Sequence, residues 1–326
     1  MAVSDPAPAT VTPVQIEQKF GHVQIEDLIR GIPRDQALAD FSKLCAAPAA
    51  LGMHRLGMKA NEHFAAPEVF KAYRILQHNG VARPTIRAVW ASPRHKAKLF
   101  EAAARLFRAK PIDAIQGKHI LTSYKLQHGS VALFRPMVAK YLFTHYSPRG
   151  RILDFCAGWG GRLLGALATP HVTSYVGIDS NSDMTPVYAA MAKLSGDTCV
   201  RTICAPAETL DYASLGRFDC VMTSPPYYGI EVYRHMPGYR DYDTWIREFL
   251  FVVLRNITRH IDQDGTIIIN IRQPRTEELM VQEMGRLGWG VAETLNYRLS
   301  AMPGKGCRKA VKDYGEPIYV FKKSPR

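Results

Sequence analysis

The sequence predicts an α/β protein in which a mostly helical N-terminal domain precedes a mainly parallel sheet of seven strands. Between about residues 24 and 110, apolar residues recur every three or four positions, as in PEVFKAYRILQH and RHKAKLFEAAARLFRAK, and this spacing is typical of helices. After about residue 119, short apolar or β-branched runs alternate with helical stretches, which is the pattern of βαβ units. We therefore expect a flexible tail over residues 1–23, a basic helical domain over 24–118 and an α/β domain over 119–326.

The individual elements follow in order along the chain. Residues 1–15 are rich in Ala, Pro, Thr and Val, which is typical of a flexible tail. In the helical domain, the turn at Asn79-Gly80 and the apolar spacing of Ile86, Val89 and Trp90 are compatible with a DNA-reading helix-turn-helix, and equally with an ordinary helical pair. A helix over RPMVAKYLFTHY precedes the sheet. The expected strands are RILDFCAG, SYVGIDS, CVRTICA, FDCVMTS, GTIIINI, WGVAETLNYRL and EPIYVFKK.

Composition and charge restrict the classes of function. The chain has 326 residues, of which 47% are hydrophobic, so it can bury a sizeable core in one large domain or two modest ones. It has no apolar run of the ~18 residues that suggest a membrane span and no secretion signal at its beginning. Its six cysteines form no CxxC pair, which argues against a zinc ribbon or a disulfide scaffold and indicates a reducing cytoplasm. The net charge of +13, with a marked excess of Lys and Arg in residues 31–118, favours a nucleic acid partner over a merely solvated basic surface.

A glycine-rich turn follows the first expected strand. That strand ends at Asp154, and the loop after it contains Gly158 and Gly160 and runs directly into a helix. Glycines at such a turn allow a ligand to approach the backbone closely. About 20 residues later the second strand ends at Asp179, whose carboxylate can accept hydrogen bonds from ribose hydroxyls. Because position 163 is Leu rather than the third glycine of a dinucleotide fingerprint, the pattern indicates a nucleoside site of another kind.

A rigid turn, Ser224-Pro225-Pro226-Tyr227, follows the expected strand over 218–223. Neither proline has an N–H for the ladder, so the turn ends the strand at the edge where open α/β sheets bind ligands. The turn suits methylation of an exocyclic amino group, whose lone pair is conjugated with the base and is therefore a poor nucleophile. Ser224 Oγ and the Pro225 carbonyl are candidates to accept the two amine N–H bonds, which directs the lone pair at the methyl donor. Tyr227 is a candidate to stack on a base that has rotated out of a duplex.

Both motifs resemble those of the class I S-adenosylmethionine-dependent DNA amino-methyltransferases. The D-x-x-x-G-x-G-G loop is similar to their motif I, and Ser-Pro-Pro-Tyr is similar to their motif IV, [DNS]-P-P-[YFW]; the resemblance covers about residues 130–326. It implies a Rossmann-like class I methyltransferase sheet, S-adenosylmethionine as cofactor with no metal, and DNA, expected to be double-stranded, as partner. It also implies that the cofactor is bound by Phe134, Pro136, Asp154, Phe155, Cys156, Ala157, Gly158, Gly160, Asp179, Ser180 and Glu208.

The loop over 229–242 is expected to be a lid or a substrate-binding loop, because long loops beside sites commonly have this role. Within and beside it, Tyr228 and Tyr233 are candidates to stack on bases, and Arg234 and Arg240 to meet phosphates. An ordinary packed connection is the alternative. A basic, glycine-containing loop over 302–312 is a further candidate to reach the DNA backbone.

The sequence leaves both the target base and the class of substrate open. Ser in the first motif position favours cytosine N4 slightly over adenine N6, whereas carbon-5 methylation is disfavoured because no cysteine follows a proline. No long insertion resembles a target-recognition domain, so residues 31–118 and the 229–242 loop are the candidates to recognise a DNA sequence. The chain shows no nuclease motif that would indicate a restriction–modification system. An RNA base methyltransferase, a methyltransferase of protein glutamine amides and an inactive DNA-binding protein of the same fold are the alternatives.

Overall fold

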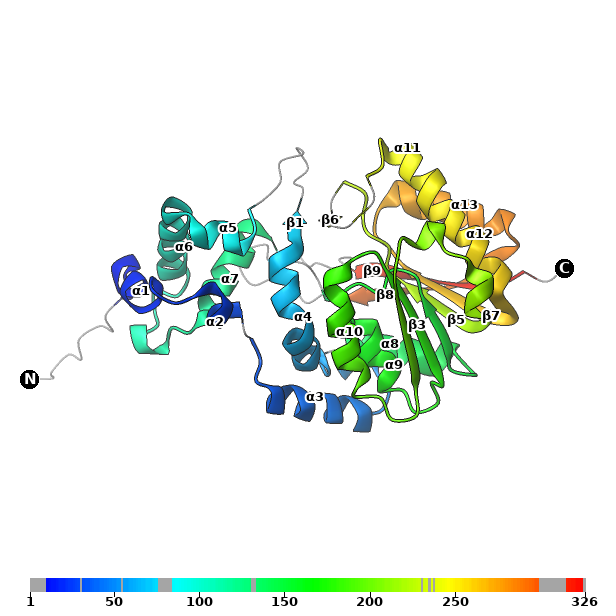
Figure 1. Cartoon of the computed structure of the whole chain (residues 1–326), viewed down its shortest axis with the longest axis horizontal. Coiled ribbons are helices and arrows are strands. Elements are labelled where there is room, and N and C mark those ends of the chain that lie inside the picture. Colours follow the sequence, from blue (N-terminus) through cyan, green and yellow to red (C-terminus); the bar gives the residue numbers. More distant parts are fainter. Residues whose placement is uncertain are drawn as a thin grey trace, which may run out of the picture.

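The computed structural model places a group of helices beside a mainly parallel sheet that is flanked by helices (Figure 1). It describes residues 10–29, 31–53, 55–75, 84–129, 133–229, 231–233, 236, 238–298 and 315–324. The expected turn at Asn79-Gly80 and the basic loop over 302–312 lie outside the described residues. The helix-turn-helix hypothesis therefore stays a prediction.

Seven strands form one sheet in the C-terminal part of the chain, as predicted. They are β2 (Arg151–Asp154), β3 (Ser174–Asp179), β4 (Cys199–Cys204), β5 (Phe218–Thr223), β7 (Ile261–Asn270), β8 (Trp289–Arg298) and β9 (Gly315–Lys323). The order across the sheet is β4-β3-β2-β5-β7-β9-β8; the first five are parallel, and β9 is antiparallel to both of its neighbours. This is the class I methyltransferase arrangement, so the predicted fold class is confirmed.

The strand order reverses between β2 and β5, and this position determines where a ligand can bind. From β2 the chain proceeds through β3 and β4 to one edge of the sheet, and β5 then lies on the opposite side of β2. Ligands of open α/β sheets bind at the carboxyl ends of the strands beside such a reversal. Asp154, Asp179 and Thr223 are the last residues of β2, β3 and β5. The glycine loop and the Ser-Pro-Pro-Tyr turn therefore begin at one edge of the sheet.

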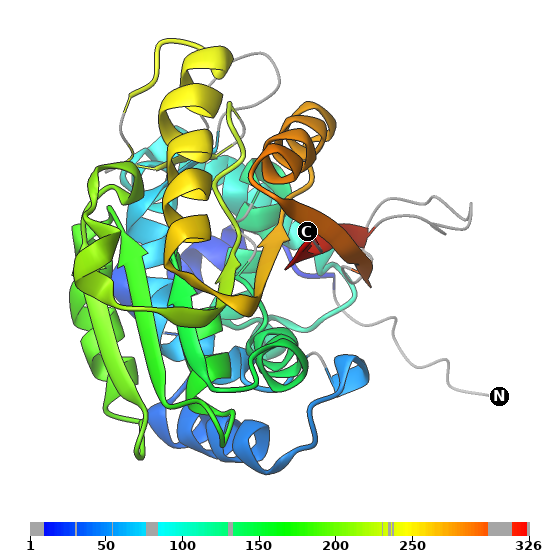
Figure 2. The same cartoon turned by 90° about the vertical axis from the view of Figure 1, so that its right-hand side faces the viewer.

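Helices cover both faces of the sheet (Figure 2). One face carries α8 (Pro136–Tyr146), α9 (Gly161–Leu167) and α10 (Thr185–Ala192); the other carries α11 (Tyr242–Trp245), a π-helical turn over Ile246–Leu250, α12 (Phe251–His260) and α13 (Pro274–Arg286). Successive side chains of a strand point to opposite faces of the sheet. Accordingly, Met222 of β5 lies in the hydrophobic core on the side of α8, α9 and α10, and Val221 lies in the core on the side of α12 and α13. Burial on both faces accounts for the apolar residues on both sides of the central strands, as in β5, where all six residues are buried.

The N-terminal region contains two groups of helices. Its elements are α1 (Pro13–Phe20), α2 (Ile25–Ile29), α3 (Arg34–Ala46), α4 (Met58–Ala72), β1 (Tyr73–Ile75), α5 (Ile86–Ala91), α6 (Pro93–Leu106) and α7 (Gly117–His128). The helices α1, α2, α5, α6 and α7 share a hydrophobic core of their own. In contrast, α3 and α4 pack against the core of the α/β part through Phe41, Leu44 and Ala65. None of the helices in the described residues is long and apolar enough to cross a membrane.

Two predicted boundaries differ from the structure. The expected tail over 1–23 includes α1, which Thr12 caps by accepting a hydrogen bond from the backbone N–H of Gln15 at 3.3 Å. Ile16 and Phe20 of α1 are buried in the helical core, so the tail assignment is wrong over this helix. The expected domain boundary after residue 118 falls inside α7. Composition could not show these boundaries, because both depend on tertiary packing.

The segment from α3 to β1 is attached directly to the α/β part. Lys140 of α8 is buried, and its Nζ donates to three backbone carbonyls at the C-terminal end of α3 at 2.8–2.9 Å. Asn61 of α4 donates through Nδ2 to the carbonyl of Trp159 in the glycine loop at 2.7 Å. The strand β1 pairs antiparallel with β6 (Glu231–Tyr233), which follows the Ser-Pro-Pro-Tyr turn. Residues 34–75 therefore help to shape both functional loops.

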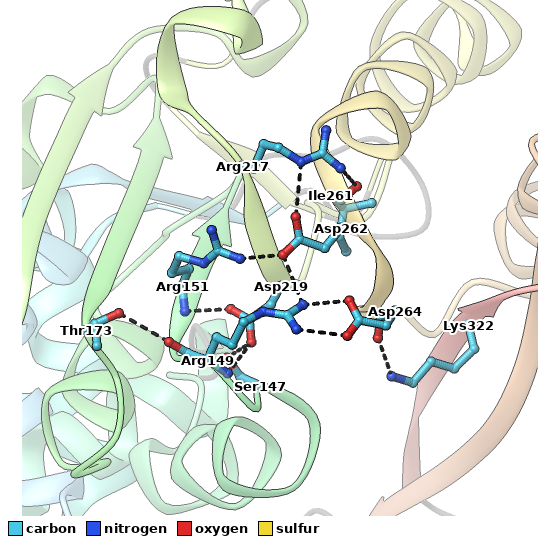
Figure 3. A network of polar contacts seen from close by, with 10 residues as sticks. All are labelled: Ser147, Arg149, Arg151, Thr173, Arg217, Asp219, Ile261, Asp262, Asp264 and Lys322. Atoms are coloured by element: carbon cyan, nitrogen blue, oxygen red, sulfur yellow. Dashed lines mark hydrogen bonds and ion pairs between the residues drawn. The ribbon is translucent and has the colours of Figure 1, made fainter.

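The opposite end of the sheet is held by a polar network (Figure 3). The buried carboxylate of Asp219 accepts from the backbone N–H groups of Arg149 and Arg151 at 2.7 and 2.6 Å. Asp262 and Asp264 at the start of β7 form ion pairs with the Arg149 guanidinium at 3.0 and 2.6 Å. Because these contacts join β2, β5 and β7 at the end away from the site, they stabilise the sheet without approaching its ligands.

Candidate active site

A cavity lies at the carboxyl ends of the central strands and brings together most of the predicted site residues. Twelve of them line it: Phe134, Phe155, Cys156, Ala157, Gly158, Asp179, Ser180, Glu208, Ser224, Pro226, Tyr227 and Tyr233. The lining does not include Pro136, Asp154, Gly160, Pro225, Tyr228 or Arg240. Arg234 lies outside the described residues. The glycine loop and the Ser-Pro-Pro-Tyr turn thus face one shared space.

The glycine loop has a shape that requires its glycines. Gly158 and Gly160 adopt φ values of 58° and 76°, in the left-handed region that side chains disfavour. A Cβ on Gly160 would also lie 2.4 Å from the sulfur of Met191. Gly161 packs against α8 so closely that a Cβ would lie 1.9 Å from the carbonyl oxygen of Phe134. The loop therefore turns tightly and leaves its backbone open toward the cavity.

Asp154 stabilises the glycine loop through buried hydrogen bonds and does not line the cavity. It is fully buried, and its Oδ2 accepts from Nε of Arg162 at 2.6 Å and from the hydroxyl of Tyr175 at 2.8 Å. Burial opposes the charge of Arg162, but the adjacent Asp154 raises the pKa of that guanidinium. The same guanidinium donates to the carbonyl of Cys156 and lines the cavity. The expected direct contact between Asp154 and a cofactor is therefore replaced by a positioning role.

Arg162 was missed in the sequence, where it begins an apparently ordinary helix. The Phe134 ring lies 5.2 Å from its guanidinium carbon, so an aromatic face and a cation meet on one wall of the cavity. The available signal was an Arg directly after the Gly-Gly pair. That signal is weak without the knowledge that the residue is buried against Asp154.

Asp179, the last residue of β3, contributes a carboxylate to the lining of the cavity. Its Oδ2 accepts from the backbone N–H of Gly158 at 2.7 Å and its Oδ1 accepts from that of Asn181 at 2.9 Å. Burial raises the pKa of Asp179 to about 6, although these two hydrogen bonds oppose the shift. A desolvated carboxylate of this kind gains from further donors, such as a pair of hydroxyl groups.

Glu208 lies on the same side of the cavity, as expected, in the short turn Ala207–Thr209 after β4. The hydroxyl of Tyr239 donates to its Oε1 at 2.5 Å. This contact fastens the middle of the 229–242 loop to the turn after β4. Burial and the adjacent Glu208 both raise the pKa of Tyr239, which keeps its hydroxyl protonated. The loop thus forms part of the cavity wall, and its role as a lid or substrate-binding loop stays a prediction.

The Ser-Pro-Pro-Tyr turn begins directly after the last residue of β5 and borders the cavity. Thr223, its predecessor, is buried and donates to Oδ1 of Asp154 at 3.3 Å. Ser224, Pro226 and Tyr227 then line the cavity, whereas the Pro225 side chain is buried behind them. This hydrogen bond therefore links the residue that precedes the Ser-Pro-Pro-Tyr turn to Asp154, which precedes the glycine loop.

Two carboxyl groups beside this turn were not predicted. Glu231 of β6 and Glu316 of β9 both line the cavity with Ser224 and Tyr227. Burial raises the pKa of Glu231 to about 7, and Glu316 adds to the shift. Burial also raises the pKa of Glu316, opposed by the charge of Arg272 and by a hydrogen bond with Tyr227. Sequence reasoning missed both because β6 and β9 reach the site only through tertiary pairing.

The predicted aromatic and basic residues in and beside the 229–242 loop lie partly inside and partly outside the cavity. Tyr233 lines the cavity and meets Trp159 edge to face, with ring centroids 6.0 Å apart. Tyr228, expected to stack on a base, packs instead between Tyr242 and Trp245, at centroid distances of 5.6 and 5.8 Å. Arg240 is exposed and pairs with the neighbouring Asp241 at 2.9 Å. Tyr228 and Arg240 therefore lie outside the cavity itself.

Residues 218–326 match the family model N6_N4_Mtase, which is described as DNA methylase. This match and the seven-stranded, mainly parallel sheet both support a methyltransferase fold in the C-terminal part of the chain. The predicted relationship to the amino-methyltransferase family is confirmed over this C-terminal part, which contains the Ser-Pro-Pro-Tyr turn. No curated protein matches the chain.

Several solved structures match part of the chain at low sequence identity. TrmN from Thermus thermophilus is 16% identical, with a TM-score of 0.42, over 58% of this chain and 49% of its own; this chain thus spans about half of its length. A putative methyltransferase from Thermoplasma acidophilum is 15% identical, with a TM-score of 0.39, over 60% and 77% of the two chains. A methyltransferase from Pyrococcus furiosus is 13% identical, with a TM-score of 0.41, over 59% and 84%.

Proposed function

We propose that the protein transfers a methyl group from S-adenosylmethionine to an exocyclic amino group of a base in duplex DNA, with cytosine N4 ahead of adenine N6. The observation that carries the proposal is the shared cavity, which Ser224 and Tyr227 line together with Gly158 of the glycine loop and Asp179. A methyl donor and an amine acceptor can therefore meet in one enclosed space.

The residues on the cofactor side fit S-adenosylmethionine. The desolvated Asp179 carboxylate suits the two ribose hydroxyls, and the backbone of Ala157 and Gly158 suits the methionine part. Glu208 lies where the resemblance places the adenine, and Phe134 closes the same wall. When bound, the cofactor supplies a methyl group activated by its sulfonium.

The residues on the substrate side fit a planar base with an amino group. Ser224 Oγ and the Pro225 carbonyl accept the two amine N–H bonds and so expose the nitrogen lone pair. The Tyr227 ring offers a stacking surface, and burial, followed by the nearby Glu316 and Glu231, raises its pKa, so it stays neutral. Ser in the first position of the turn is the basis for placing cytosine ahead of adenine.

The helical domain supplies a surface suited to a polyanion. The exposed side of α6 and the turn after it carry Arg94, Lys98, Arg105, Arg108 and Lys110. Duplex DNA binds such surfaces through its phosphates, without regard to sequence. The description of the matched family as DNA methylase supports the same choice of substrate.

The test is an incubation of the full chain with S-adenosylmethionine labelled in the methyl group and unmethylated duplex DNA, followed by digestion to nucleosides and mass spectrometry. Labelled N4-methylcytosine supports the proposal in full, and N6-methyladenine corrects only the base. Structured RNA and a protein extract are treated in parallel. Label in either of these, with none in DNA, overturns the DNA assignment.

A further inference from the structure

We propose, resting on the function proposed above, that Glu231 is a catalytic residue that accepts the proton lost by the amino group when it is methylated. The amine nitrogen forms a bond to the methyl carbon while the carbon–sulfur bond breaks, and the sulfonium becomes a neutral thioether. The nitrogen then carries one proton too many. In this proposal that proton passes to the Glu231 carboxylate, directly or through one water, and leaves as the carboxyl exchanges with solvent.

The motif residues themselves do not supply an acceptor for this proton. The Ser224 hydroxyl is a hydrogen-bond acceptor but not a base near neutral pH, and the Pro225 carbonyl and the prolines have no basic group. A carboxylate or imidazole near the nitrogen can take up this proton. Among the described residues that line the cavity, the carboxyl groups are Asp179, Glu208, Glu231 and Glu316. Asp179 and Glu208 lie on the cofactor side.

Local contacts hold Glu231 in place directly after the Ser-Pro-Pro-Tyr turn. The backbone N–H of Glu231 donates to the carbonyl of Tyr227 at 3.0 Å, which closes the chain directly after the catalytic turn. The register of β6 with β1 then fixes Glu231 opposite Ile75 and Tyr233 opposite Tyr73. The hydroxyl of Tyr233 donates to Oε2 of Glu231 at 2.9 Å and orients the carboxyl.

The charged surroundings separate the two carboxyl groups further. Glu316 lies in the field of Arg272 and Arg135 and is hydrogen-bonded with Tyr227, all of which favour its ionised form. Glu231 is influenced by hydrogen bonds with Tyr233 and the backbone of Tyr227 and by the negative charge of Glu316, and the cations Arg135 and Arg162 line the same cavity. The pKa of Glu231 near 7 suits a group that must take up and release a proton at neutral pH.

The proposal also explains the attachment of the N-terminal region to the site. Without its pairing to β1, the three-residue strand β6 would lack its only sheet partner among the described residues. Residues 34–75 thus hold the proposed base in place, although they lie more than 150 residues from it in sequence.

The experiment compares single-turnover methyl transfer by the wild type, Glu231→Gln and Glu316→Gln between pH 5.5 and 9. The matched control is Glu278→Gln, on the exposed side of α13. We expect Glu231→Gln to slow transfer by about 100-fold or more and to remove the rise in rate that the wild type shows as pH passes about 7, because only the ionised carboxylate accepts a proton. Calorimetry should give the same affinity for S-adenosylmethionine in all four proteins, within about threefold.

A second variant keeps the proposal testable if Glu231→Gln misfolds. Tyr233→Phe retains the ring but removes the hydrogen bond that favours the ionised Glu231, so the rise in rate should move to higher pH. Titration of a ¹³C-labelled glutamate carboxyl by NMR should show the same upward shift without any substrate. The shift in both measurements supports the role of Glu231.

Some results overturn the proposal. A Glu231→Gln rate within threefold of the wild type, with an unchanged pH profile, excludes Glu231 as the base, and so does loss of the pH-dependent rise in Glu316→Gln alone. Duplex DNA and structured RNA are both offered as substrates. Transfer to RNA alone overturns the DNA assignment but leaves the comparison of the Glu231 variants valid, whereas no transfer by the wild type to either substrate overturns both proposals.

Discussion

Replacing Asp179 by Asn should change stability and cofactor affinity in opposite directions as pH rises. Burial raises the pKa of Asp179 from 3.8 to about 6. The fold therefore disfavours the ionised carboxylate, and the stability that this group contributes is greatest in acid and is lost as pH rises through about 6. One pKa unit corresponds to about 1.4 kcal/mol, so the ionised form costs the cofactor-free protein about 3 kcal/mol at pH 8.

The Asn side chain removes that cost but introduces another. Its single oxygen can replace only one of the two acceptor oxygens that Gly158 and Asn181 use, and an unsatisfied buried N–H costs about 1–3 kcal/mol. The absolute stability of Asp179→Asn should thus be close to that of the wild type. The difference in unfolding free energy, variant minus wild type, should nevertheless rise by about 1.4 kcal/mol between pH 5 and pH 8, because only the wild type titrates there.

Urea denaturation at the two pH values measures this difference, and calorimetry measures the affinity for S-adenosylmethionine. If ribose hydroxyls donate to the charged carboxylate, Asp179→Asn should bind the cofactor about 10- to 100-fold more weakly at pH 8, since hydrogen bonds to charged groups contribute about 1.5–3 kcal/mol. Wild-type affinity should fall as pH drops below about 6. A stability difference that is constant with pH refutes the burial argument, and equal affinities at pH 8 refute the ribose role.

Three other substitutions test separate parts of the argument. Ser224→Ala should lower the methyl-transfer rate about 100-fold with little change in cofactor affinity, measured by single-turnover kinetics and calorimetry; a near-wild-type rate contradicts its role toward the amine. Arg105→Ala on α6 should weaken DNA binding and reduce the slope of log affinity against log salt by about 0.9, whereas an unchanged slope removes α6 from the DNA interface. Asp219→Ala should destabilise the fold by about 3 kcal/mol in urea, because two backbone N–H groups lose a buried charged acceptor, while cofactor affinity per folded molecule stays the same. Loss of affinity in folded Asp219→Ala would contradict the separation of this network from the site.

Local patterns predicted those parts of the molecule that local chemistry determines. The alternation of apolar runs and helices predicted all seven strands of the sheet, and the reason is clearest for the central strands, which are buried between two layers of helices. The placement of Gly158 beside Asp179 was also predictable, since both follow parallel strands and such strands end at one edge. The role of Asp154 was not, because the same motif residue can face a ligand or a buried Arg, and only packing distinguishes the two.

The parts that sequence reasoning missed depend on contacts between distant segments. The helical region was expected to be a separate DNA-binding domain, yet α3, α4 and β1 pack on the α/β part and touch both functional loops. Asn61 reaches the glycine loop and β1 pairs with the strand that carries Glu231. A truncation designed on the expected boundary after residue 118 would remove these supports and cut through α7. Loss of methyl transfer in such a truncation would therefore be no evidence that the removed residues bind DNA, whereas the single substitution Arg105→Ala tests that role with the site intact.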